Sequence, residues 1–247
     1  HDNIIQKHFH DDPRVRATKL LLQERIPHGV VSLPPKAAAV ELEVQHAEPL
    51  IPLIRRYTDP NRSSPHIQFL SNRNYSMMIS TAGSGYSKCG ELAVTRWKED
   101  PTCDNWGSYI FVRDLNGNCI WSTTYQPLIK PPETYEAIFG DEKVEFHRKD
   151  GDISTCTQIL VAPEDNAEIR HVTLTNHSDE SRDLELTSYL EPVLSPKDSD
   201  LSHLAFSKLF IQTSVLASKN ALLAKRRIRS SSDKEIWGIH VVVTDGE

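Results

Sequence analysis

Two turn signals divide the middle of this chain into strand-like runs. They are Asn116-Gly117 and Asp150-Gly151, and each lies between two runs rich in β-branched and aromatic residues (109–113 with 119–123, and 144–148 with 153–161). Asn-Gly and Asp-Gly are typical of tight β-hairpins, because both central residues of a type I′ turn need a positive φ. We therefore predict two antiparallel hairpins, with positive φ at these turn positions.

Further strand-like runs follow towards the C-terminus. Ile169, Val172 and Leu174 lose the alternation of apolar and polar residues once, which predicts a β-bulge. Residues 236–243 are apolar on both faces of a strand, which predicts a central strand. Ten or more short strands with few helices favour a mainly β fold, a large antiparallel sandwich.

The first quarter of the chain has a different character. Pro13 follows two aspartates that can cap a helix, and Pro27 and Gly29 end the apolar segment, so a short helix is predicted there. Six prolines between residues 28 and 66 break any sustained period, although residues 40–44 suit a strand. We therefore expect an N-terminal helix and extended linker over residues 1–66, and a β domain over 67–247. Since the chain begins at a histidine and ends just after an apolar strand, we expect a segment of a longer protein.

Charge and cysteine content narrow the class of protein. The net charge is −6, from 34 acidic and 28 basic residues, which disfavours nucleic acid as a partner. The basic run at 225–229 suits a solvated strand end. Cys89, Cys103, Cys119 and Cys156 form no CxxC pair and have no histidine at a zinc-like spacing, so we expect neither a disulfide framework nor a metal site. With no apolar span and no signal peptide, we expect a cytoplasmic segment without direct membrane contact.

Residues 72–126 combine three tryptophans and four tyrosines with Asn, Asp, Arg, Ser and Gln. Flat aromatic faces can cover the apolar face of a sugar ring, while planar polar side chains bond its hydroxyls. The same aromatics could equally form the core and the cross-strand pairs of a β-sheet. The glycine-containing stretch 82–85 can likewise touch a ligand or only turn a strand.

Signals for catalysis are weak. We find no GxSxG, phosphate-loop or HExxH motif. The acidic residues that could act as a glycosidase pair are not brought together by their spacing, and the histidines are scattered. We therefore expect no catalytic residue and no metal ligand in this chain.

Many blocks of the sequence, in the same order, resemble one family. They include Leu70-Ser71-Asn72, Gly85-Tyr86-Ser87, Leu92-Ala93-Val94-Thr95-Arg96-Trp97, Asp104-Asn105-Trp106-Gly107, Trp121-Ser122, Tyr125-Gln126-Pro127 and Ala205-Phe206-Ser207-Lys208. In these blocks the chain resembles the N-terminal β-sandwich domain of the glycoside phosphorylases of glycoside hydrolase family 94, formerly glycosyltransferase family 36. Within that family it most resembles the branch of cyclic β-1,2-glucan synthases. Arg73, Ser84 and Cys89 depart from the family pattern, which has glycine, glycine and tryptophan there.

The resemblance implies a β super-sandwich like that of galactose mutarotase, followed in the parent protein by a helical (α/α)6 barrel that carries the general acid. The parent would phosphorolyse or trim β-1,2-glucan with inversion, with inorganic phosphate as co-substrate and no other cofactor, and would be held at the inner membrane by other segments. This chain would not catalyse alone. It would pack on its own downstream barrel, and its loops at residues 83–89 and 121–135 would support a homodimer.

On this basis seven residues are our candidates for contact with β-glucan: Tyr86, Ser87, Arg96, Asn105, Trp121, Tyr125 and Gln126. Three alternatives stay open. The chain could be a stand-alone carbohydrate-binding module, a purely structural interface domain, or a mutarotase-like enzyme, which would need a histidine and a carboxylate in one cleft.

Overall fold

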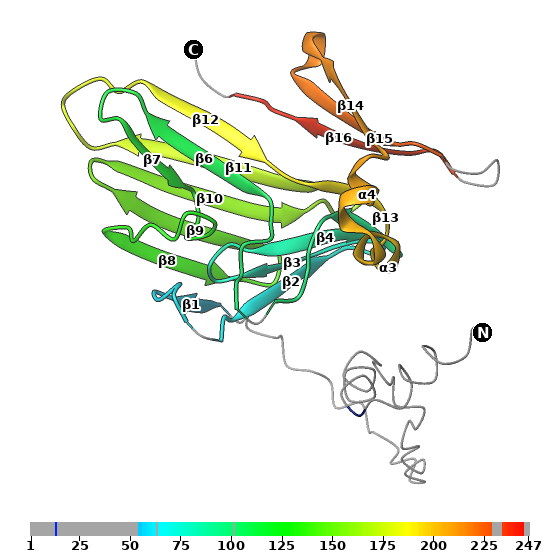
Figure 1. The fold of residues 1–247 in the computed structure, drawn as a ribbon. Coiled ribbons are helices and arrows are strands. Elements are labelled where there is room, and N and C mark those ends of the chain that lie inside the picture. The colour runs from blue at the N-terminus through cyan, green and yellow to red at the C-terminus, as the bar shows by residue number, and fades with distance from the viewer. Residues whose placement is uncertain (1–12, 14–53, 63, 101, 229–233, 245–247) are drawn as a thin grey trace, which may run out of the picture. The chain divides into compact units, whose positions relative to one another are not determined.

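The computed structural model describes residues 13, 54–62, 64–100, 102–228 and 234–244. Pro13 is helical, whereas the rest of the predicted N-terminal helix and the strand at 40–44 lie outside the described residues. From residue 54 onward the chain forms four antiparallel sheets (Figure 1). The predicted mainly β fold is therefore confirmed.

The first five-stranded sheet has the order β1-β8-β9-β10-β11, and the second has the order β13-β5-β4-β3-β2. The strands of the first are β1 (Arg55–Tyr57), β8 (Thr134–Phe139), β9 (Lys143–Asp150), β10 (Ile153–Val161) and β11 (Glu168–Asn176). Those of the second are β2 (Ile67–Ser71), β3 (Tyr75–Ser80), β4 (Gly85–Cys89), β5 (Leu92–Thr95) and β13 (Pro192–Pro196). β1 precedes the boundary expected at residue 67, because three residues of the linker pair with β8.

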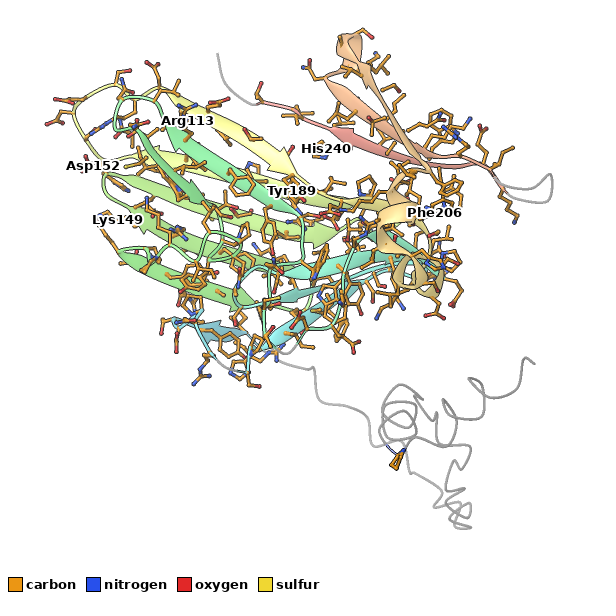
Figure 2. The ribbon with its side chains drawn as sticks, in the orientation of Figure 1. Arg113, Lys149, Asp152, Tyr189, Phe206 and His240 are labelled. Carbon is orange, nitrogen blue, oxygen red and sulfur yellow. The ribbon has the colours of Figure 1, made fainter. Side chains whose placement is uncertain are left out.

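Two three-stranded sheets complete the described fold. One has the order β12-β6-β7 and contains β6 (Tyr109–Asp114), β7 (Cys119–Ser122) and β12 (Leu184–Tyr189). The other has the order β14-β15-β16 and contains β14 (Ile211–Leu216), β15 (Ala221–Arg226) and β16 (Ile236–Val241), with a 3-10 turn at Ala217–Lys219. Two short helices, α3 (Lys197–Ser202) and α4 (Leu204–Lys208), lie between β13 and β14. In Figure 2, His240 on β16 lies near β12, and its Nε2 is 2.8 Å from Ser188 Oγ of that strand.

Both predicted hairpins are confirmed. β9 pairs with β10 so that Asp150 lies opposite Ile153, and the turn consists of Gly151 and Asp152. Gly151 has the predicted positive φ, at +60°, whereas Asp150 does not. β6 pairs with β7, but here the positive φ belongs to Asn118 and not to Asn116 or Gly117. The reason is that Asp114 Oδ1 accepts hydrogen bonds from the backbone N–H groups of both turn residues, which builds a longer loop than a type I′ turn.

The predicted bulge in β11 is wrong. β10 and β11 pair without a break from Ile153↔Asn176 to Val161↔Glu168. Glu168 and Arg170 lie on the more buried side, joined by an ion pair of 2.9 Å, while Ile169 on the opposite side is 50% exposed. Because an ion pair occupies the inward face and an isoleucine the outward face, the alternation of apolar and polar residues breaks in the sequence although the strand pairing is regular.

The last strand was also predicted wrongly. β16 lies at the edge of its sheet in the described part of the chain, and alternate residues are exposed, with Ile239 at 68%. Apolar residues on both faces of a strand show that it is hydrophobic, but they do not show how many neighbours it has.

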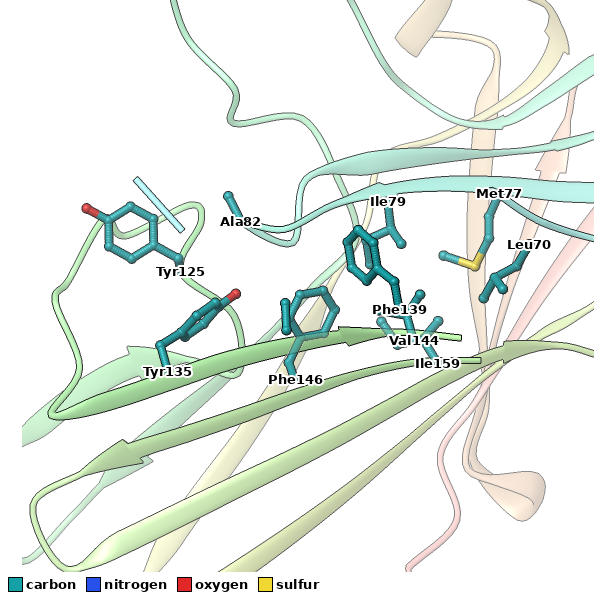
Figure 3. Packing of buried hydrophobic residues seen from close by; sticks show 11 residues of the cluster. Leu70, Met77, Ile79, Ala82, Tyr125, Tyr135, Phe139, Val144, Phe146 and Ile159 are labelled. Atoms are coloured by element: carbon teal, nitrogen blue, oxygen red, sulfur yellow. The ribbon is translucent and has the colours of Figure 1, made fainter. Parts of the chain in front are cut away.

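The main core lies between the two five-stranded sheets (Figure 3). Leu70 and Met77 from β2 and β3 pack with Phe139, Val144 and Ile159 from the facing sheet. Burying one such side chain contributes roughly 1.5–3 kcal/mol. A second cluster joins Val112 of β6 and Trp121 of β7 to Ile153 of β10. One face of the first sheet is thus covered at one end by the second sheet and at the other by the β6–β7 hairpin.

Candidate functional site

A cleft of about 410 Å³ opens beside strands β4 and β5. Its wall contains Tyr86 and Ser87 from β4, Arg96 and Trp97 just after β5, and Lys197 and Asp200 from α3. Its volume lies within the range of small-molecule sites. Three of the seven predicted glycan contacts are therefore gathered at one cleft, although they come from separate segments.

Arg96 forms the charged floor of the cleft. Its side chain is 2% exposed, and its Nε and Nη2 donate to the two carboxylate oxygens of Asp200, each at 2.8 Å. Its Nη1 donates to Glu191 Oε2 at 2.7 Å. This paired geometry is the strongest that a guanidinium makes with a carboxylate. Arg96 thereby holds α3 against the end of β5.

Arg96, Asp200 and Glu191 stabilise one another in their ionised forms. Burial acts to raise the pKa of Asp200, but hydrogen bonding and charge attraction from Arg96 outweigh it, so the pKa is lowered overall. Burial also acts to raise the pKa of Glu191, but hydrogen bonds from Tyr189, Lys208 and Arg96 outweigh it, so this pKa is lowered too. The hydrogen bonds from Arg96 to Asp200 raise the pKa of Arg96. All three groups are therefore ionised at neutral pH.

Two aromatic rings line the cleft beside this floor. The centroids of Tyr86 and Trp97 lie 5.3 Å apart with an interplanar angle of 51°, and both residues are half-buried. Lys197 Nζ lies 5.1 Å from the centroid of the Trp97 ring. Each ring keeps part of its surface open, and ammonium and carboxylate groups lie nearby. This combination suits a ligand with an apolar face and polar edges.

Ser87 faces the cleft, but its hydroxyl is already used. It donates to Glu168 Oε2, which also accepts from the Tyr75 hydroxyl at 3.2 Å. Burial acts to raise the pKa of Glu168, whereas Arg170 and Ser87 lower it, and the net shift is downward. Ser87 is 2% exposed. In this structure it belongs to a buried polar network that joins β4 to β11.

Trp121, Tyr125 and Gln126 lie in the interior instead of at the cleft. Trp121 is 2% exposed, and its Nε1 lies 3.5 Å from Thr155 Oγ1. Figure 3 shows Tyr125 in the main core, near Ala82. The backbone N–H of Gln126 donates to Ala82 O at 2.9 Å, and the peptide bond to Pro127 is cis. A sugar could reach these three side chains only if the residues that cover them moved.

Asn105 is exposed, in the segment between β5 and β6. Its neighbour Trp106 accepts a hydrogen bond from the backbone N–H of Gly85 at 2.8 Å, so this segment lies beside the start of β4. Asn105 does not line the cleft described above.

The glycine stretch 82–85 packs against the chain itself. A Cβ on Gly83 would lie 2.3 Å from the Thr124 Cβ, and a Cβ on Gly85 would lie 1.9 Å from the Met78 carbonyl oxygen. Both glycines are therefore required for close approach of backbone and side chains.

Two residues of this region were not among the predicted contacts. Trp97 lines the cleft next to Arg96, because both follow the end of β5, where strict alternation between faces no longer holds.

Arg148, whose side chain is fully buried, donates to the carbonyl oxygens of Thr124 at 2.9 Å and Lys130 at 3.0 Å and pairs with Asp150. It therefore anchors the loop that follows β7.

Comparison with known proteins assigns this architecture. The family model of the glycosyl hydrolase 94 supersandwich domain matches residues 51–247. The chain belongs to this family. The resemblance predicted from the sequence blocks is thus confirmed, and the sheets described above are those of a GH94 supersandwich domain.

Its relatives include a synthase and several phosphorylases. The chain is 37% identical over 238 residues to the cyclic beta-(1,2)-glucan synthase NdvB of Rhizobium meliloti (strain 1021), covering 96% of this chain and 8% of that protein. It is 30% identical over 129 residues to a 3-O-beta-D-glucopyranosyl-beta-D-glucuronide phosphorylase of Paenibacillus borealis, covering 52% and 16%. It is 27% identical over 148 residues to an N,N'-diacetylchitobiose phosphorylase of Vibrio proteolyticus, covering 58% and 18%. The matched part of this chain therefore spans less than a fifth of the length of each of these proteins. Among its described helices, none has the length and apolar character to cross a membrane.

Proposed function

We propose that this supersandwich domain binds β-1,2-linked glucan in the cleft at Tyr86 and Trp97, and forms a non-catalytic wall of the substrate site in a larger phosphorylase or glucan synthase. The observation that carries the proposal is the pair of half-exposed rings beside fixed charges in a cleft of about 410 Å³. The names of two relatives support a β-linked glucoside as the ligand, because one is a cyclic beta-(1,2)-glucan synthase and the other a 3-O-beta-D-glucopyranosyl-beta-D-glucuronide phosphorylase.

The charges of the cleft support a binding role over a catalytic one. Phosphorolysis with inversion needs a carboxylic acid that protonates the leaving oxygen while phosphate attacks the anomeric carbon to form glucose 1-phosphate. Asp200, which lines the cleft, is held ionised by Arg96. Glu191, which lies on the other side of Arg96, is held ionised by Tyr189, Lys208 and Arg96, so neither carboxyl group is in the state that donates a proton. The acid would come from another domain of the larger protein, as would most of the phosphate contacts.

Two matched tryptophan variants test the binding proposal. Trp97 and Trp237 each carry a lysine ammonium over the ring, at 5.1 and 4.8 Å, but only Trp97 lines the cleft. We expect saturation-transfer NMR to show contact between β-1,2-oligoglucosides and the wild-type chain. Trp97→Ala should weaken the affinity about tenfold, the effect of losing one aromatic contact worth about 1.4 kcal/mol.

Trp237→Ala should leave the affinity unchanged. Equal affinity in Trp97→Ala and wild type would refute the cleft as the binding site. An absence of saturation transfer in the wild-type chain would favour the purely structural interface domain instead.

A second experiment tests the non-catalytic role. We expect the chain, incubated with β-1,2-oligoglucosides and inorganic phosphate, to release no glucose 1-phosphate. Release by the chain alone would show that one of its own carboxyl groups is catalytic and would refute this part of the proposal.

A role in dimerisation is supported by the tip of the loop after β7. Leu128 is 41% exposed and Ile129 is 54% exposed, although both are apolar. Ile129 has a φ of +54°, which is unusual for a β-branched residue and holds the side chain out at the tip. We expect Leu128→Glu with Ile129→Glu to shift the full-length protein from dimer to monomer in light scattering. Leu115→Glu, at a residue that is 52% exposed in the β6–β7 turn, is the control. A dimer that survives the double change would exclude this loop tip.

A further inference from the structure

Three side chains with metal-binding atoms meet on the outer face of the first five-stranded sheet. Glu145 and His147 are two residues apart on β9, so they project from the same face. Cys156 on β10 is paired directly with His147 in the register. This pairing brings together residues from separate segments that share no recognisable motif spacing.

The distances between the ligand atoms suit a tetrahedral ion. Glu145 Oε2 lies 3.1 Å from His147 Nε2, and Cys156 Sγ lies 4.0 Å from the same nitrogen. The carboxylate, imidazole and thiol atoms all lie within 4.8 Å of one another. In a tetrahedral zinc site, bond lengths of 2.0–2.3 Å give edges of about 3.3 Å between nitrogen and oxygen and about 3.6 Å between nitrogen and sulfur. Rotations of these partly exposed side chains would bring the ligand atoms, which are now at most 4.8 Å apart, to these distances.

We propose that Glu145, His147 and Cys156 form a binding site for a divalent cation of borderline softness, with Zn²⁺ the best fit. The donor set of one carboxylate oxygen, one imidazole nitrogen and one thiolate sulfur is one that Zn²⁺ accepts. Cys156 binds as a thiolate, so its thiol proton is released to solvent as the ion enters. Three protein ligands leave the fourth position open to water or to a donor from outside the chain.

Lys143 is the main competitor for this site. Its Nζ lies 2.7 Å from Glu145 Oε1, the carboxylate oxygen that does not face His147. The Lys143 side chain is 48% exposed, so it can swing into solvent when the ion binds. Its positive charge opposes the ion, and Lys143→Gln should therefore tighten Zn²⁺ binding several-fold.

Cobalt and zinc titrations of the 247-residue chain test the site. Co²⁺ replaces Zn²⁺ and gives a thiolate-to-metal charge-transfer band when a cysteine is a ligand. We expect this band in the wild-type chain and its loss in Cys156→Ser. His147→Gln should weaken the binding of Zn²⁺, measured by calorimetry, at least tenfold. The matched controls Cys119→Ser, at an exposed cysteine on β7, and His171→Gln, at an exposed histidine on β11, should bind as the wild type does.

The proposal is overturned if the charge-transfer band is absent from the wild-type chain, or if it persists unchanged in Cys156→Ser. Circular dichroism of each variant separates loss of a ligand from loss of the fold. None of the three ligands lines the cleft at Trp97. A failure of the zinc-binding test therefore leaves the glucan-binding proposal intact, and a failure of the glucan-binding test leaves the zinc proposal intact.

Discussion

Removal of the Arg96 charge should measurably destabilise this domain. Arg96 pairs with Asp200 through two hydrogen bonds and with Glu191 through one, and its side chain is 2% exposed. Arg96→Met preserves most of the length of the side chain and removes the charge. The change therefore isolates the electrostatic contribution from the packing of the stem.

The size of the effect follows from what each carboxylate loses. Removing one partner of a buried ion pair costs about 3–5 kcal/mol, because it leaves the other charge buried and unpaired. Glu191 keeps Lys208 Nζ at 3.0 Å and is 24% exposed, so its loss is small. Asp200 is 5% exposed and loses both hydrogen bonds from Arg96, but it keeps a hydrogen bond from Ser207 and the attraction of Arg226. We therefore expect the lower end of the range, about 3 kcal/mol of unfolding free energy. For a domain of this size this is a fall in Tm of roughly 6–12 °C.

Urea unfolding and differential scanning calorimetry at pH 7 measure this loss. The double variant Arg96→Met with Asp200→Leu should recover part of the stability, because a buried ion pair replaced as a whole by apolar groups is often close to neutral. The reasoning would be refuted if Arg96→Met lay within about 1 kcal/mol of the wild type. It would also be refuted if the double variant were destabilised by the full sum of the two single changes.

Three further predictions concern pH, the glycine stretch and the core. Asp200 and Glu191 have lowered pKa values in the folded chain, so their ionised forms stabilise the fold at pH values above their unfolded pKa of about 4. This stability is lost as the pH falls through the lower folded pKa values, and urea unfolding from pH 7 to 3 should show the loss. The destabilisation caused by Arg96→Met should become smaller in acid. A free energy of unfolding that does not change with pH would contradict the lowered pKa values of Asp200 and Glu191. Gly85→Ala should cost about 3 kcal/mol, since its Cβ would lie 1.9 Å from the Met78 carbonyl oxygen. Gly151→Ala, with open space around the new Cβ, should cost only about 1–2 kcal/mol because of its φ of +60°. Equal losses of unfolding free energy in Gly85→Ala and Gly151→Ala would contradict the predicted clash with the Met78 carbonyl oxygen. Trp121→Ala should cost about 3–5 kcal/mol in urea unfolding because that ring is buried, and a loss below about 1 kcal/mol would mean that the ring is not part of the core.

The fold was predictable where its signals are local. The two hairpins were found because each turn and its two strands follow one another directly in the sequence, and alternation marks the buried side of β10 directly. The errors arose where partners are distant. The ion pair of Glu168 and Arg170 replaces apolar residues on the inward face of β11, and β16 has one neighbouring strand in the described chain despite its hydrophobicity. The short helix α3 carries too few residues for a periodic signal.

The site was predictable only in part for the same reason. Tyr86 and Arg96 belong to blocks that resemble the family, and both line the cleft. The partnership of Arg96 with Asp200 spans 104 positions and no local pattern announces it. Aromatic content could not separate Trp97 from Trp121, since one follows the end of a strand and the other points into the core. The three residues of the candidate zinc site were missed because strand pairing, and not sequence spacing, brings Cys156 to His147.

The anchoring of the loop after β7 has a consequence for how such domains can diverge. Arg148 holds the loop through the carbonyl groups of Thr124 and Lys130, and backbone carbonyls are the same in every amino acid. The exposed tip at Leu128 and Ile129 takes no part in that anchor. Mutations at the tip can therefore accumulate with little loss of stability while the base keeps its position. The loop is a natural place for related proteins to acquire new partners, and for engineers to insert foreign recognition sequences.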